Sequence, residues 1–259
     1  MKLSTRLIFP ILFSIISIGI IYQGYFLFHN IESEITQPRH FPYQSFAYIT
    51  IELEFPQQSM SDTGGHLGSA SSRGSGIAIG RTSTGNTAIL TANHVCNPPP
   101  FLVAVWTLGA TKTISVTDFY GNSYPARIIL NDVVDDLCLL EIENFPHRLV
   151  RFSTAPAEIG EKVYSVAAPL AFFSPGMVPL LDGYYSGDTF SSNGIDSVYT
   201  VPAREGSSGS SIINERGEIV GVVHSSLTGF QSITICSTHN QVRAFLGQFV
   251  SLLNGTLAH

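Results

Sequence analysis

From residue 46 to residue 236, the chain consists of short segments rich in β-branched and aromatic residues, separated by turns of glycine, proline, asparagine and serine. Such segments are typical of β-strands, and few stretches show helical spacing. They fall into two groups of six, which predicts an all-β protein of two packed, six-stranded antiparallel β-barrels. The expected strands are residues 46–55, 75–81, 87–92, 102–107, 124–130 and 137–142 in a first barrel at about 46–150, and residues 162–167, 177–185, 197–202, 210–214, 219–224 and 232–236 in a second at about 160–236.

A C-terminal helix is expected at about 238–254, because apolar residues recur there at the spacing of one helix face. This stripe consists of Val242, Phe245, Leu246, Phe249, Val250 and Leu253. Residues 57–74 are rich in serine and glycine and hold almost no large apolar side chain, so they cannot bury enough surface to offset their ordering cost. We therefore expect a mobile loop between the first two strands.

Composition restricts the kind of partner and cofactor. With 44% hydrophobic residues the chain can form a sizeable core, and with a net charge of -6 and no run of lysine or arginine it is not expected to bind nucleic acid. The three cysteines, Cys96, Cys138 and Cys236, allow at most one disulfide, and their spacing matches no metal site. Neither a metal nor a cofactor is expected, and the sequence leaves open whether Cys96 and Cys138 are bonded.

The N-terminus carries an apolar run at residues 7–28, which is long enough as a helix to cross the ~30 Å hydrocarbon core of a membrane. Lys2 and Arg6 precede the run, and Glu32 and Glu34 follow it. By the positive-inside rule, the N-terminus stays in the cytoplasm and the rest of the chain is exported to the periplasmic or extracellular side.

The apolar run therefore predicts a transmembrane anchor within residues 1–30, followed by a linker at 31–45 and a globular domain at 46–254. The alternative is a signal peptide whose cleavage releases a secreted protein. The anchor is favoured because the run is long for a signal peptide, no Ala-x-Ala site follows it, and aromatic residues gather near its end.

One serine lies in a turn suited to nucleophilic catalysis. Ser208 stands between Gly206 and Gly209, in a turn that precedes the apolar segment Ile212-Ile213. Glycines allow backbone angles that direct successive N–H groups into one concavity. The backbone N–H groups of Gly206 and Ser208 are therefore the expected oxyanion-binding donors.

A base and an orienting carboxylate are also available. His94 follows the apolar strand at 87–92 in a polar turn, and Asp136 directly precedes the strand at 137–142. Asp135 is the local rival, but the alternation of side chains along the strand favours Asp136. Ser208, His94 and Asp136 thus supply a nucleophile, a general base and a group that orients the base.

Four blocks of sequence together resemble the trypsin-like serine peptidases, in the order His, Asp, Ser. They are Ser75-Gly76-Ile77-Ala78-Ile79-Gly80, Leu90-Thr91-Ala92-Asn93-His94-Val95, Asp136-Leu137-Cys138-Leu139-Leu140 and Gly206-Ser207-Ser208-Gly209-Ser210. The blocks are most similar to the bacterial HtrA-type and glutamyl-endopeptidase branches. Ser210 departs from the glycine or proline of many members, and the stretch after Cys236 is too short for the PDZ domain of HtrA proteins.

The resemblance implies a chymotrypsin-like double barrel, with the triad of His94, Asp136 and Ser208 at the cleft between the barrels. It also implies a substrate pocket formed by residues just before the nucleophile and by the strand after it. The expected pocket residues are Pro202, His224, Ser225 and Ser226. None of them is a carboxylate, which disfavours substrates with lysine or arginine in the pocket, and His224 is a candidate for recognising an acidic or amide side chain.

The sequence thus predicts a serine endopeptidase that hydrolyses protein or peptide substrates through an acyl-enzyme, without a cofactor. The main alternative is a catalytically silent, protease-like domain that serves as a binding or scaffolding module at a membrane. A third possibility is a zymogen, although nothing in the linker resembles an activation site.

Overall fold

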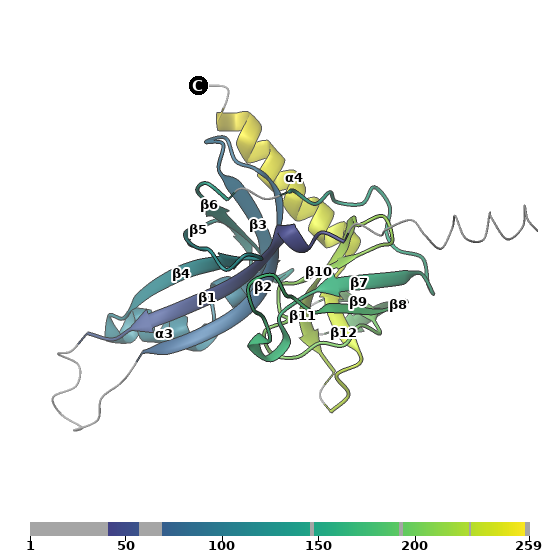
Figure 1. The fold of residues 1–259 in the computed structure, drawn as a ribbon, viewed down its shortest axis with the longest axis horizontal. Helices are drawn as coiled ribbons and strands as arrows, with labels where there is room; N and C mark the ends of the chain where they lie inside the picture. The colour runs from purple at the N-terminus through teal and green to yellow at the C-terminus, as the bar shows by residue number, and fades with distance from the viewer. Residues whose placement is uncertain (1–40, 57–68, 146–147, 192–193, 228, 257–259) are drawn as a thin grey trace, which may run out of the picture. The chain divides into compact units, whose positions relative to one another are not determined.

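Strands form most of the regular structure, and they close into two antiparallel barrels of six strands each (Figure 1). The computed structural model describes residues 41–56, 69–145, 148–191, 194–227 and 229–256, and the strands are counted over these ranges. The all-β class and the two six-stranded barrels predicted from the sequence are confirmed.

The first barrel has the strand order β1-β2-β3-β6-β5-β4. Its strands are β1 (Phe46–Glu54), β2 (Ala70–Arg81), β3 (Thr87–Ala92), β4 (Thr111–Asp118), β5 (Ser123–Asp132) and β6 (Leu137–Ile142). The second barrel has the order β10-β11-β12-β9-β8-β7. Its strands are β7 (Lys162–Val166), β8 (Leu180–Ser191), β9 (Gly194–Tyr199), β10 (Ser211–Ile213), β11 (Ile219–Ser226) and β12 (Thr234–Ser237).

β3 and β6 are mostly apolar, with Thr87, Thr91 and Glu141 as their polar residues, because both of their faces are buried. Ile89 and Leu140 point into the core of the first barrel, whereas Leu90 and Leu139 join an apolar cluster with Ile213 and other residues of the second barrel. A strand buried on both faces shows a continuous apolar run instead of alternation. These two strands therefore anchor one barrel to the other, and His94 and Asp136 lie at their ends.

The helix α4 (His239–Thr256) closes the described chain and covers the cluster between the barrels with Val242, Phe245 and Phe249 (Figure 1). Its start is a capping box: Thr238 N–H donates to Gln241 Oε1 at 2.6 Å, and Gln241 N–H donates to Thr238 Oγ1 at 3.3 Å. The predicted C-terminal helix is confirmed.

One predicted strand is wrong. Residues 102–107 belong to the helix α3 (Pro99–Leu108), and the fourth strand of the barrel follows it at Thr111–Asp118. The helix has proline at its first positions and ends at Gly109, whose φ of 65° is left-handed. Proline at the start and glycine at the end are helix signals, and they outweigh the β-branched content of this short apolar run.

Two further predictions concern segments that lie partly or wholly outside the described residues. The expected mobile loop at 57–74 overlaps β2, which begins at Ala70, while residues 57–68 lie outside the described part. The expected transmembrane anchor at 1–30 and most of the linker at 31–45 also lie outside it. Within the described ranges, no helix combines the length and the apolar character needed to span a membrane.

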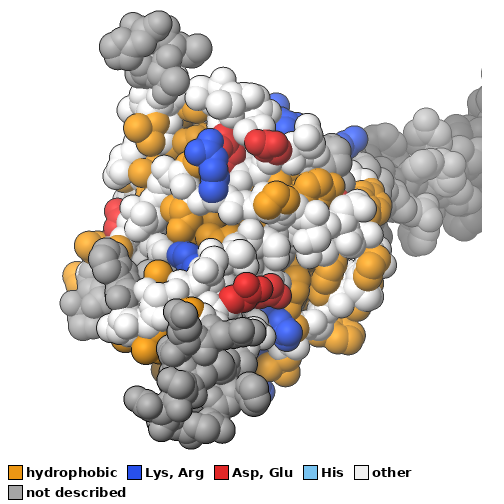
Figure 2. Space-filling model, turned by 90° about the vertical axis from the view of Figure 1, so that its left-hand side faces the viewer, with side chains coloured by type: hydrophobic (Ala, Val, Ile, Leu, Met, Phe, Trp, Pro, Cys, Tyr) orange, Lys and Arg blue, Asp and Glu red, His pale blue; other side chains and the backbone are white. Residues whose placement is uncertain are grey.

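The structure settles the cysteine pairing. Cys96 and Cys138 form a disulfide, and Cys236 is a free, buried thiol whose pKa is raised by burial. On the face of the molecule shown in Figure 2, the visible lysine and arginine side chains are scattered, and some of them lie beside acidic side chains.

Candidate active site

His94 and Asp136 face each other at the rim of the first barrel. One carboxylate oxygen of Asp136 lies 2.6 Å from His94 Nδ1, and the other accepts the backbone N–H of His94 at 2.8 Å. A carboxylate can only accept hydrogen bonds, so Nδ1 carries the proton. In the neutral ring, Nε2 is then left as an acceptor, which is the state that a general base requires.

His94 is held by the short helix α2 (Asn93–Cys96), which begins where β3 ends. The Asn93 N–H donates to the backbone oxygen of Asp136 at 3.0 Å, and Asn93 Oδ1 accepts from Asn131 and Asn97. At the other end of α2, Lys112 Nζ donates to the Cys96 carbonyl at 3.1 Å, and burial lowers the pKa of this lysine. The orientation of His94 therefore depends on the backbone contacts of α2 as well as on the contact of the His94 ring with Asp136.

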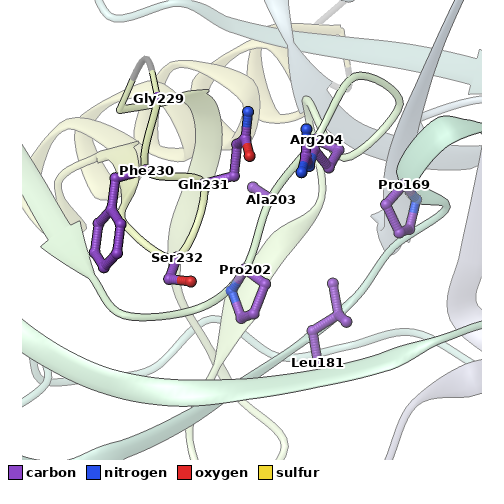
Figure 3. A pocket seen from close by; sticks show the side chains of 9 residues that line it. All are labelled: Pro169, Leu181, Pro202, Ala203, Arg204, Gly229, Phe230, Gln231 and Ser232. Atoms are coloured by element: carbon purple, nitrogen blue, oxygen red, sulfur yellow. The ribbon is translucent and has the colours of Figure 1, made fainter.

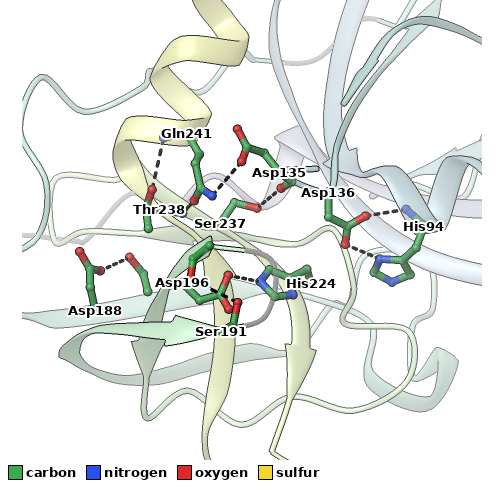
Figure 4. A network of polar contacts seen from close by, with 12 residues as sticks. His94, Asp135, Asp136, Asp188, Ser191, Asp196, His224, Ser237, Thr238 and Gln241 are labelled. Atoms are coloured by element: carbon green, nitrogen blue, oxygen red, sulfur yellow. Dashed lines mark hydrogen bonds and ion pairs between the residues drawn. The ribbon is translucent and has the colours of Figure 1, made fainter. Parts of the chain in front are cut away.

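Asp135, the rival carboxylate, points elsewhere (Figure 4). Its Oδ1 accepts from Gln241 Nε2 at 2.8 Å, and its backbone oxygen accepts from Ser237 Oγ at 2.8 Å. Asp136 has a φ of 52°, a left-handed conformation that aspartate tolerates better than most residues. This turn places the two neighbouring carboxylates on different partners, Asp136 on the first barrel and Asp135 on α4.

The turn around Ser208 has the glycine conformations expected of a nucleophile turn. Gly206 and Gly209 have φ of 90° and 82°. A Cβ on Gly206 would lie 2.4 Å from the Ala168 carbonyl oxygen, and a Cβ on Gly209 would lie 2.0 Å from Thr91 Oγ1. Only glycine fits these two positions, for reasons of both space and backbone angle.

The hydrogen bonds of this turn leave the N–H groups of Gly206 and Ser208 without an acceptor among the described residues. Three amides around them donate to backbone carbonyls at 2.7–3.0 Å, namely those of Ser207, Gly209 and Ser210. The N–H groups of Gly206 and Ser208 donate to no acceptor in the described part of the chain. The Glu205 carbonyl accepts from Leu170 N–H at 2.6 Å, so the Gly206 N–H of the same trans peptide points the opposite way. These two free donors match the pair expected for an oxyanion site.

The Ser208 turn packs against the end of β3, close to where α2 carries His94. A Cβ on Gly209 would lie 2.9 Å from the backbone nitrogen of Ala92, two residues before His94. The Ser208 side is tied to β2, because Ser75 N–H donates to the Ser208 carbonyl at 2.8 Å. The structure gives no hydrogen bond between His94 and Ser208 among the described residues, and catalytic contacts often tighten only when substrate binds.

Ser210, which departs from the family pattern, has a buried role. Its hydroxyl accepts a hydrogen bond from Ser165 Oγ of β7 at 3.0 Å. Buried polar groups need hydrogen-bond partners, and the two hydroxyls supply one for each other. The departure is therefore accommodated inside the second barrel.

His224 directly follows Val223, whose carbonyl accepts from Gly209 N–H of the Ser208 turn at 2.7 Å, and His224 faces a cavity. It lines a cavity of 180 Å³ together with His94, Asp136 and Asp196 (Figure 4). His224 Nε2 lies 3.3 Å from Asp196 Oδ1, and the two side chains are 20% and 14% exposed. The cavity thus holds two His–Asp pairs side by side.

A second, more apolar pocket of 380 Å³ is lined in part by residues 202–204, which come shortly before Ser208 in the chain (Figure 3). Its wall is formed by Pro169, Leu181, Pro202, Ala203, Arg204, Gly229, Phe230, Gln231 and Ser232. Of the four predicted pocket residues, Pro202 lines this pocket and His224 lines the 180 Å³ cavity, while Ser225 and Ser226 line neither. Among the described residues of this wall there is no carboxylate, and the charged side chain is that of Arg204, so these residues offer no partner for a lysine or arginine side chain.

Comparison with known proteins agrees with this arrangement. A family model described as the trypsin-like peptidase domain matches residues 74–222, more than half of the chain. The chain belongs to the trypsin-like peptidase family. The crystal structure of the Rv3671c protease from M. tuberculosis in its active form is similar, with a TM-score of 0.58 and 16% sequence identity over 80% of this chain and 82% of that one. That likeness concerns the fold, and no curated protein sequence matches the chain.

Membership of the trypsin-like peptidase family implies protein or peptide substrates. The sequence pointed to His94, Asp136 and Ser208 because each lies beside a recognisable strand or turn. It missed Phe230, Gln231 and the other pocket residues of 229–232, which no local pattern distinguishes from an ordinary loop. Within the described residues, no group of three histidine, cysteine or acidic side chains is arranged to hold a metal ion.

Proposed function

We propose that the chain is a serine endopeptidase in which Ser208 is the nucleophile, His94 the general base and Asp136 the residue that orients the base. The contact of His94 with both oxygens of Asp136 carries this proposal. When the ring is neutral, this contact leaves Nε2 as an acceptor at the rim of the barrel, and the Gly206 and Ser208 N–H groups of the nearby serine turn have no acceptor among the described residues.

In the proposed mechanism, Ser208 Oγ attacks the carbonyl carbon of the scissile peptide bond and its proton passes to His94 Nε2. The carbonyl oxygen becomes an oxyanion, which accepts hydrogen bonds from Gly206 and Ser208 N–H. His94 then donates the proton to the leaving amine, and an acyl-enzyme remains. A water molecule, deprotonated by His94, hydrolyses this ester and restores Ser208.

The 380 Å³ pocket is proposed to receive the substrate side chain next to the scissile bond. It begins at Pro202 and Arg204, only a few residues before Ser208, and it reaches Pro169, whose neighbour Leu170 holds the Glu205 carbonyl. Its apolar walls and the single cation of Arg204 favour uncharged side chains over basic ones. The surroundings of His224 support a different task, because that histidine lines the 180 Å³ cavity with His94 and does not line this pocket.

A fluorophosphonate probe tests the proposed nucleophile. After incubation with the full-length chain, we expect mass spectrometry of the digest to find the adduct on Ser208, because only an activated serine reacts with such a probe. Ser208→Ala is expected to remove the adduct, whereas Ser207→Ala, which changes a buried neighbour in the same turn, is expected to keep it. An unlabelled wild-type chain would support the silent scaffolding alternative, and an adduct on another serine would reassign the nucleophile.

We further propose that residues 7–28 anchor the protein in a membrane with the peptidase domain on the exported side. The Cys96–Cys138 disulfide supports export, because disulfides persist in oxidising compartments. In a bacterial host, the full-length chain is expected to stay in the membrane fraction through alkaline carbonate extraction, and a chain starting at Ile31 is expected to be soluble. Recovery of a soluble mature form that begins after residue 30 would instead establish the secreted alternative.

A further inference from the structure

Ser75 of β2 is fully buried and joins three segments through its hydroxyl and its backbone. Its Oγ donates to the Gly206 carbonyl at 2.7 Å and accepts from Ala168 N–H at 3.1 Å. Its N–H donates to the Ser208 carbonyl at 2.8 Å, and its carbonyl accepts from Thr91 Oγ1 at 2.8 Å. One residue of the first barrel therefore contacts the nucleophile turn at two points.

These two contacts bracket the segment that carries the nucleophile. The hydroxyl of Ser75 fixes the peptide plane after Gly206, and its N–H fixes the plane after Ser208. The peptide between Ser207 and Ser208, which contains the Ser208 N–H, lies between these two fixed planes. Its direction consequently depends on Ser75 at both ends.

The Ala168 contact extends the same control to the other oxyanion donor. Ala168 precedes the short segment Pro169–Ala171, in which Leu170 and Ala171 have left-handed φ of 53° and 58°. Leu170 N–H holds the Glu205 carbonyl at 2.6 Å and so sets the direction of the Gly206 N–H. Because left-handed conformations are unfavourable for these residue types, the segment needs neighbours that hold it in place. The Ser75 hydroxyl is one such neighbour.

We propose that Ser75 is a positioning residue for the oxyanion-binding turn. By holding the Gly206 carbonyl and the Ala168 segment together, it keeps the N–H groups of Gly206 and Ser208 directed at the same point. Ser75 is inaccessible to substrate, so it acts only through the turn. The inference rests on the proposed function, because it assumes that these two N–H groups stabilise the transition state.

A hydroxyl is the group that this position requires. It must donate to a carbonyl and accept from an N–H at the same time, which a serine hydroxyl can do and an alanine methyl cannot. Removing it leaves the Gly206 carbonyl and the Ala168 N–H buried without these partners. Gly206 has the freedom to rotate in response, since glycine tolerates many backbone angles.

The test compares Ser75→Ala with Ser45→Ala in the full-length chain. Ser45 is a matched control, because it is also fully buried and its hydroxyl donates to a backbone carbonyl, that of Arg148, outside the turn. The measurements are kcat and KM on a peptide substrate, the Ki of a peptidyl trifluoromethyl ketone and the melting temperature. The ketone forms a hemiketal oxyanion with the nucleophile, so its Ki reports directly on the two N–H donors.

For Ser75→Ala we expect kcat to fall roughly 10- to 100-fold and Ki to rise by a similar factor. This loss is somewhat smaller than the loss expected when an oxyanion donor itself is removed. KM is expected to stay within about twofold of the wild-type value. Ser45→Ala is expected to keep kcat and Ki within about twofold of wild type. Its melting temperature is expected to fall about as much as that of Ser75→Ala. If Ser75→Ala does not fold, Ser75→Cys keeps the side-chain size but weakens both hydrogen bonds, and a partial loss in kcat and Ki is expected.

Several results would overturn the inference. One is a Ser75 variant that melts earlier, like Ser45→Ala, yet retains kcat and Ki. Another is a fall in kcat with an unchanged Ki, which would show that the turn is intact. If the wild-type chain neither hydrolyses peptides nor reacts with the fluorophosphonate, the proposed function fails and the inference fails with it. An active wild type with an unaffected Ser75→Ala refutes the inference alone.

Discussion

Substituting Asp136 by asparagine is expected to lower kcat about 10⁴-fold, the loss seen when the orienting aspartate of a serine-protease triad is amidated. The geometry here gives a specific reason. The backbone N–H of His94 needs an acceptor and would keep the amide oxygen, which turns the amide NH₂ toward His94 Nδ1. Nδ1 would then accept, the ring proton would move to Nε2, and the acceptor for the Ser208 proton would be lost.

The matched control for this prediction is Asp135→Asn. It makes the same chemical change one residue away, where the carboxylate accepts from Gln241 on α4 and not from His94. Its kcat is expected to stay within about threefold of wild type, since this carboxylate orients no reacting group. Full activity in Asp136→Asn, combined with a large loss in Asp135→Asn, would transfer the orienting role to Asp135. Melting temperatures of both variants separate a catalytic loss from a loss of folding.

The double barrel could be predicted because its strands carry strong local signals. β3 and β6 are predominantly apolar runs bounded by polar turns, and both are buried on two faces. α3 could not be predicted in the same way, because a short apolar run with β-branched residues fits a strand and a helix equally well. The prolines before it and Gly109 after it were the signals that favoured the helix.

The candidate site was only partly visible in the sequence. His94 and Ser208 each follow or precede an apolar strand, so their position along the chain indicated their position in the fold. The placement of His224 depends on an irregularity of pairing between Val223 and Ser225 of β11, and alternation along a strand does not reveal such a bulge. Ser75 lies in a recognisable block, yet its contacts with Gly206 and Ala168 exist only in the folded chain.

The cysteine pairing shows the same limit and has a consequence for stability. Three cysteines allow three pairings, and the sequence alone did not choose among them. The observed disulfide joins α2, which carries His94, to β6, whose Cys138 follows Asp136 by two residues. The disulfide therefore joins, across a sequence separation of 42 residues, the two segments that hold the base and its orienting carboxylate.

Removing this disulfide in a Cys96→Ala/Cys138→Ala variant is expected to lower the free energy of unfolding by roughly 4 kcal/mol, because the link restricts the unfolded chain over a loop of this length. Chemical denaturation of variant and wild type measures the loss. Cys236→Ala is the control for cysteine removal as such, because Cys236 is also buried but forms no disulfide. A reductant should still destabilise the Cys236→Ala variant, whose disulfide is intact, and it should not affect the double variant.

At a temperature where the double variant is still folded, its kcat is expected to stay within about threefold of wild type. His94 remains held by both Asp136 oxygens, and Asn93 N–H remains bonded to the Asp136 backbone, so the pair keeps its geometry without the covalent link. A folded double variant that has lost most of its kcat would show that the disulfide itself orients His94. An unfolding free energy within about 1 kcal/mol of wild type would instead show that the unfolded chain keeps these segments together.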